Sequence, residues 1–228
     1  MGHAIGMPWE IFRPTVLPLE TRPVDLYTKS GNFPGYAAQL VVIPEYEISI
    51  VLLAAGENSY EVVDYLLDLV SPAAVLRAEA VAKATAKATY TGTFNAESGN
   101  ISDAQMVLVI DKGPGVKIST WTNLGVDMLQ TFASVMFELE TSDNLDARLY
   151  PIGENDMWRV VFENISPRHN DRPVTGPACR NWMAVDNFRY GMLPVDEFRF
   201  TLEDSQDGTL RATALEAIGL RSVMVRDD

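Results

Sequence analysis

The sequence predicts an α+β module over residues 1–88, followed by an all-β module over residues 89–228. Three observations lead to this division. Runs of β-branched and apolar residues, separated by short turns, occupy the region from Trp9 to Ala55. An apolar stripe with helical spacing follows that region. Many short alternating runs then continue to the C-terminus, and this pattern is typical of an antiparallel barrel or sandwich.

In the first module the apolar runs predict strands over residues 9–12, 24–29, 36–43 and 48–54. The turns at 32–35 and 44–47 are short, so the strands they join are expected to be antiparallel neighbours. Ser59 is a suitable N-cap for a helix that follows. Pro72 is expected to interrupt this helix and to begin a second, alanine-rich helix that ends near residue 88.

In the second module the pattern predicts one helix over residues 126–137, with Met128, Leu129 and Phe132 on one face. A polar, proline-flanked segment at 167–177 predicts a mobile loop. Short alternating runs predict the strands 88–94, 104–110, 116–122, 147–151, 158–162, 182–185, 197–202, 210–214 and 221–225.

Composition and charge exclude several classes of function. The 228 residues carry a net charge of −13, which disfavours nucleic acid as a partner. The single cysteine, Cys179, excludes an intrachain disulfide, and we expect neither a metal site nor a cofactor. No run of residues is long and apolar enough for a membrane span, and the N-terminus has no signal-peptide pattern. A cytoplasmic location is expected, or secretion if an N-terminal segment is missing.

The run Tyr27-Thr28-Lys29-Ser30-Gly31 is the strongest candidate for a functional site. Lys29 and Ser30 place a cation and a hydroxyl at the end of a strand, where they can hold a carboxylate or a carbonyl. Gly31 lacks a Cβ, so a ligand can approach the backbone there. The alternative is that the triplet is an exposed strand end before a turn.

With Trp9-Glu10 upstream and Gly35-Tyr36 downstream, this order of motifs resembles the C-terminal part of the fungal β-lactamase-like serine hydrolase family, which has the serine β-lactamase and transpeptidase fold. The resemblance covers nearly the whole chain and implies a partial transpeptidase-like sheet with helix, followed by a lipocalin-like barrel or sandwich. It implies that Lys29 and Ser30 are catalytic. Gly31, Asn32 and Tyr36 would contact the ligand, with a backbone N–H near Asn32 in the oxyanion hole.

The family's Ser-x-x-Lys motif does not occur in these 228 residues, and no Tyr/Ser-x-Asn motif lies upstream of the triplet, where the family has it. The acyl-accepting serine and its base are therefore missing from the site as written. We expect acyl-enzyme chemistry only with a further segment or chain.

Two further residues of the second module are candidate ligand contacts. Trp121 lies in a predicted strand, where it belongs either to a packed core or to an apolar barrel interior that holds a hydrophobic small molecule. His169 lies in the polar loop beside Arg168 and Asp171, where it is either an acid–base or ligand contact or a surface residue.

Three functions remain open at this stage. In the first, the chain is a truncated or partner-dependent hydrolase or acyltransferase, and a homodimer or a complementary chain covers its exposed sheet. Alternatively, it is a small-molecule-binding or cyclase/isomerase-type protein of fungal secondary metabolism that uses a barrel cavity. The third possibility is a non-catalytic interaction module.

Overall fold

The computed structural model describes residues 2–14, 24–96, 103–153, 156–167, 188–205 and 208–227. Its fold is mixed and mostly strand, with two α-helices in the described residues. The chain divides into two compact units, Met1–Ala84 and Thr85–Asp228, which are described separately below. The strand predicted at 182–185 and most of the loop predicted at 167–177 lie outside the described residues.

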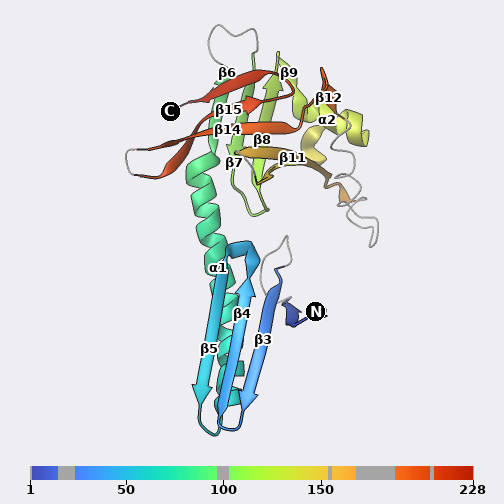
Figure 1. The fold of residues 1–228 in the computed structure, drawn as a ribbon. Helices are drawn as coiled ribbons and strands as arrows, with labels where there is room; N and C mark the ends of the chain where they lie inside the picture. Colours follow the sequence, from blue (N-terminus) through green and yellow to red (C-terminus); the bar gives the residue numbers. More distant parts are fainter. Residues whose placement is uncertain are drawn as a thin grey trace. The chain divides into compact units, whose positions relative to one another are not determined.

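The first unit is built on an antiparallel sheet in which every strand pairs with its neighbour in sequence. Its strand order is β1-β2-β3-β4-β5, and β3, β4 and β5 are drawn side by side in Figure 1. The first strand was not predicted from the sequence. The strands are β1 (Gly2–Gly6), β2 (Trp9–Arg13), β3 (Leu26–Phe33), β4 (Tyr36–Ile43) and β5 (Ile48–Ala55), with the 3₁₀ helix η1 (Pro44–Tyr46) between the last two.

One face of this sheet forms the core of the first unit. Leu26, Val41 and Ile43 are buried against Val75 of helix α1 (Ser59–Tyr90). The helix contributes a stripe at intervals of four residues, in which Val63, Ser71 and Val75 are buried. This spacing places the stripe on one side of the helix, so α1 covers one face of the sheet and leaves the other face to solvent.

Helix α1 differs from the prediction in that it is continuous through Pro72. A proline inside a helix removes one hydrogen bond and costs about 3 kcal/mol. The apolar stripe continues on both sides of Pro72, and the alanine-rich second half has high helix propensity. Packing and propensity together outweigh the break, so the two predicted helices are one. The helix also includes residues 88–90, which were predicted to begin a strand.

The described residues of the second unit form an antiparallel barrel of eight strands. Its strands follow one another around the ring, and pairing of β8 with β10 closes it. A short strand β9 (Val126–Asp127) pairs with β8, and β12 (Arg189–Tyr190) with β13 (Leu193–Pro194) forms a separate ribbon. The barrel strands are β6 (Gly92–Ala96), β7 (Gln105–Val109), β8 (Val116–Asn123), β10 (Leu145–Pro151), β11 (Met157–Asn164), β14 (Glu197–Asp204), β15 (Leu210–Ala217) and β16 (Ser222–Arg226).

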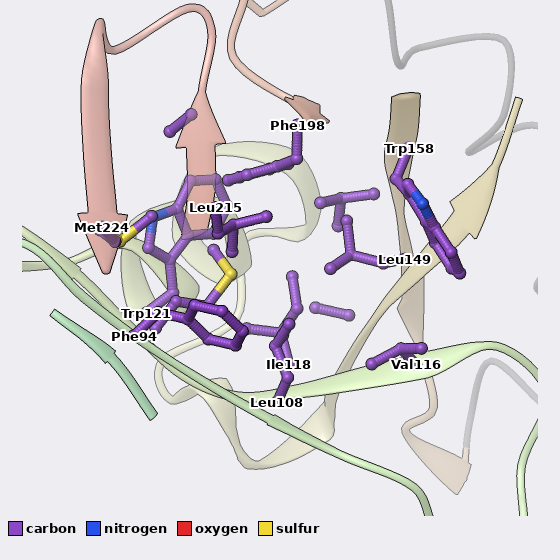
Figure 2. Close-up of a cluster of buried hydrophobic side chains, with 14 of the residues drawn as sticks. Phe94, Leu108, Val116, Ile118, Trp121, Leu149, Trp158, Phe198, Leu215 and Met224 are labelled. Carbon is purple, nitrogen blue, oxygen red and sulfur yellow. The ribbon is translucent and has the colours of Figure 1, made fainter. Parts of the chain in front are cut away.

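Large apolar side chains fill the barrel, and Figure 2 shows the labelled ones pointing toward one another. Helix α2 (Met128–Phe137) begins after Asp127, whose carboxylate caps the backbone N–H of Gln130. Its Phe132 stacks on Trp121 and on Phe162, with ring centroids 5.4 and 4.4 Å apart. The described part of the barrel is therefore a packed core.

A β-bulge in β8 sets which of its residues face this core. Opposite the step from Val107 to Leu108, strand β8 carries one extra residue, Ser119. Because of that residue, Ile118 and Trp121 are both buried although they are three positions apart. A simple alternation of two would have turned one of them outward.

Neither helix in the described part of the chain is long and apolar enough to cross a membrane.

Candidate functional site

Lys29 and Ser30 lie on β3 and share one carboxylate, that of Glu10 on the neighbouring strand β2. The Lys29 Nζ atom lies 2.9 Å from Glu10 Oε1, and the Ser30 hydroxyl donates to the same oxygen at 3.3 Å. Lys29 Nζ also donates to the Ser30 carbonyl at 3.1 Å. The cation, the hydroxyl and the carboxylate therefore form one polar cluster at the edge of the sheet.

Pairing between β2 and β3 holds Glu10 in this place. Glu10 lies opposite Thr28 in the strand register. The buried Thr28 hydroxyl donates to the Glu10 carbonyl at 3.0 Å, and the rings of Trp9 and Tyr27 meet edge to face at 6.5 Å. These contacts fix the strand that carries Glu10, so its side chain reaches the Lys29–Ser30 end of β3.

Glu10 is ionised in this setting. A hydrogen bond from the Lys29 ammonium holds the pKa of the Glu10 carboxyl below its usual range, although desolvation acts in the opposite direction. The charge of Lys29 and the hydroxyl and backbone N–H of Ser30 act in the same direction. The sequence placed Glu10 in a strand and in the Trp9-Glu10 motif upstream of the triplet, but did not predict it as a site residue. Its role depends on a register between distant strands, for which the local sequence carries no signal.

The edge of β3 is open beyond this cluster. Among the described residues, β2 pairs with β3 only from Leu26 to Thr28, whereas β4 pairs with it as far as Phe33. A two-residue turn joins Phe33 to Tyr36, so these two residues exchange the backbone hydrogen bonds nearest the turn. Alternation along the ladder then directs the Asn32 N–H away from β4, toward the open edge.

Gly31, Asn32 and Tyr36 line a shallow groove of about 630 Å³ that begins beside this cluster. The exposed rings of Phe33 and Tyr36 and the exposed side chain of Leu53 give it an apolar surface. Three candidate residues from the sequence therefore meet in one groove. A Cβ added at Gly31 would lie 3.9 Å from the Ala38 Cβ, which is ordinary contact.

The groove belongs to a sheet face that is apolar and exposed. Val51 and Leu53 are 62% and 73% exposed, and Phe33 and Tyr36 are 73% and 63% exposed. Contiguous apolar exposure of this kind is uncommon on the surface of monomeric proteins.

The two remaining candidate residues lie elsewhere. Trp121 is 1% exposed in the barrel core, between Phe132 and Phe198. A ligand contact at Trp121 requires space that these rings occupy, so the packed interior argues against the barrel as a ligand cavity. That Trp121 contacts a ligand therefore stays a prediction. His169 lies outside the described residues.

The comparisons with known proteins agree with the motif order. A family model described as the C-terminal domain of beta-lactamase-like-like proteins matches residues 82–228. The chain belongs to this family. The β-lactamase-like match begins within α1 and runs through the barrel.

Three curated relatives extend the β-lactamase-like similarity. A beta-lactamase-like protein of Arthroderma benhamiae is 29% identical over 99% of this chain and 42% of its own length. The probable hydrolase clz13 of Cochliobolus lunatus is 31% identical over 75% of this chain and 26% of its own. The probable hydrolase M10 of a Phoma species is 31% identical over 55% and 21%. The chain thus spans less than half the length of these relatives.

Proposed function

We propose that this chain provides one wall of a serine hydrolase or acyltransferase site of the β-lactamase type. Lys29 and Ser30 hold the substrate carbonyl or its neighbouring polar group, and the Asn32 N–H stabilises the developing oxyanion. The nucleophile and its base come from polypeptide beyond these 228 residues. The supporting observation is that Lys29, Ser30 and Asn32 meet at an open strand edge beside an apolar groove.

In this proposal the sheet of the first unit corresponds to part of a transpeptidase-like sheet, and the barrel to a lipocalin-like domain. The order of strands around the barrel supports the second correspondence, because each strand pairs with its neighbour in sequence. The exposed face around Leu53 supports the need for further polypeptide, since a sheet in an α/β sandwich is covered on both faces.

The nucleophile is expected on polypeptide that covers this face, from the same protein or from a second chain. The Arthroderma benhamiae relative supports this expectation, because 42% of its length accounts for 99% of this chain. More than half of the relative thus lies outside the match and is available to carry the missing groups.

A complementation experiment tests the proposal. The chain is co-produced with the part of the Arthroderma benhamiae relative that lies outside the match, and hydrolysis of p-nitrophenyl acetate is measured. We expect hydrolysis from the pair and none from either part alone. Lys29→Ala should lower kcat/KM by roughly 10²–10³, because a hydrogen-bond donor to the substrate carbonyl is lost in the transition state.

The matched control is Lys87→Ala, which removes an exposed lysine from the end of α1. It should leave kcat/KM unchanged. If the pair associates and Lys29→Ala hydrolyses the ester as fast as the parent chain, the proposed role of Lys29 is wrong.

A further inference from the structure

The Lys29–Ser30 cluster already holds a carboxylate, that of Glu10. Both oxygens of Glu10 are used: Oε1 lies 2.9 Å from Lys29 Nζ, and Oε2 lies 3.4 Å from the Ser30 hydroxyl. These are the contacts that a cation and a hydroxyl would otherwise offer to the carboxylate of a ligand. The anion-binding capacity of the cluster is therefore occupied from within the chain.

This occupancy changes the charge that an incoming ligand meets. Lys29 and Glu10 carry opposite unit charges 2.9 Å apart, so their fields largely cancel at the open edge of β3. Two neighbouring charges are also matched, since Arg13 on β2 pairs at 2.7 Å with Asp25, which directly precedes β3. A ligand carboxylate would gain little attraction from Lys29 and would be repelled by Glu10.

A neutral carbonyl does not meet this obstacle. Within the described part of the chain, Glu10 contacts Lys29 and Ser30 and leaves the Asn32 N–H at the open edge to a carbonyl oxygen. The adjoining groove, with Phe33, Tyr36 and Leu53, offers an apolar surface to the rest of such a ligand.

We propose that Glu10 is a specificity-determining residue that makes this site select neutral esters with an apolar acyl group over free carboxylates. This inference rests on the proposed acyl-transfer function. It adds the substrate class, which the Lys-Ser-Gly triplet alone leaves open between a carboxylate and a carbonyl.

The test compares two probes with the same acyl chain, methyl hexanoate and sodium hexanoate, in which a neutral methyl ester replaces the charged carboxylate. Each is titrated into the ¹⁵N-labelled chain, and the amide signals of Gly31 and Asn32 are followed by NMR. We expect the parent chain to bind the ester more tightly than the carboxylate. Glu10→Gln should strengthen hexanoate binding about tenfold and leave ester binding within about twofold, because one screened charge is removed.

The matched control is Asp25→Asn, which removes the same charge from the nearby exposed pair with Arg13. It should leave both affinities unchanged. Glu10→Ala repeats the test with a smaller side chain, and circular dichroism melting checks that each variant is folded.

Four results would overturn the inference: equal binding of the two probes by the parent chain, an unchanged preference in both folded Glu10 variants, an equal gain from Asp25→Asn, or no response to either probe. The titration needs no nucleophile. The ester preference can therefore hold when the complementation experiment fails, and it can be lost when that experiment succeeds.

Discussion

The Arg148 guanidinium holds both carboxylate oxygens of Asp111 at 2.8 Å and so ties β10 to the turn between β7 and β8. The same side chain donates from Nε to Asp146 and from Nη1 to the Pro114 carbonyl at 3.0 Å. Arg148 is 8% exposed. These contacts hold the turn at 111–115 against β10, near the residues through which β8 pairs with β10.

Removal of Arg148 should destabilise the barrel. Arg148→Ala leaves Asp111 and Asp146 close together with one cation fewer, and loss of one partner from a buried pair costs about 3 kcal/mol. Urea denaturation measures the change in the free energy of unfolding. Arg199→Ala is the control, because its pair with Glu216 is exposed and should contribute less than about 1 kcal/mol. Equal effects of the two variants would contradict this prediction.

The same cluster predicts a dependence of stability on pH. A hydrogen bond from Arg148 lowers the pKa of Asp111 from 3.8 to about 2. The depressed pKa favours the charged form in the folded protein, so this stabilisation is present above pH 3.8 and is lost as the pH falls through about 2. Unfolding measured across this window should show a shallower slope in Asp111→Asn than in the parent chain. Asp64→Asn, on the exposed side of α1, should keep the parent slope.

Gly113 and Gly31 should respond differently to a methyl group. A Cβ at Gly113 would lie 2.4 Å from the Arg148 Cζ atom, and several hydrogen bonds hold that guanidinium in place. Gly113→Ala should therefore cost about 1–3 kcal/mol. Gly31→Ala should change stability by less than about 1 kcal/mol, since its Cβ makes only ordinary contact. Thermal melts of the two variants give the comparison, and a melting temperature equal to that of the parent for Gly113→Ala would contradict it.

Trp121 offers a test of whether the barrel has room for a ligand. Trp121→Ala should lower stability by about 3–5 kcal/mol, because it leaves a cavity beside Phe132 and Phe198. We expect indole to raise the melting temperature of this variant and not that of the parent chain, whose core is filled. A comparable rise in the parent chain would instead favour a natural cavity.

Leu53 tests whether the open sheet face is a contact surface. Leu53→Lys changes a side chain that is 73% exposed, so the stability of the chain should change by less than about 0.5 kcal/mol. The charge should nevertheless prevent association with the complementing polypeptide, which size-exclusion chromatography of the co-produced pair measures. Leu210→Lys, at an exposed position of the barrel, is the control and should leave association intact. Association unaffected by Leu53→Lys would place the partner elsewhere.

Local patterns in the sequence were sufficient for most strands. The strand predicted at 36–43 is β4, Tyr36–Ile43, because its apolar alternation is bounded by two turns. The helix predicted at 126–137 is α2, which begins after its cap Asp127. Such signals lie within a few residues of the element they define.

Features that depend on distant contacts were not predicted. Pro72 alone predicts a break in the helix. The helix is nevertheless continuous, because the stripe that contains Val63 and Val75 packs on both sides of the proline. Glu10 joins Lys29 and Ser30 only through the pairing of β2 with β3. The sequence therefore identified one part of the candidate site, and the strand register added the carboxylate.

The closure of the barrel between β8 and β10 leaves the ring of described strands without a free edge. A closed ring uses the backbone hydrogen-bonding groups of its own strands, so it cannot seed the addition of a foreign strand. In the described residues of the first unit, by contrast, β5 lies at the edge of its sheet over Ile48–Ala55. A partner, inhibitor or misfolded copy that docks by extending the sheet of the first unit therefore meets β1, β5 or the open end of β3.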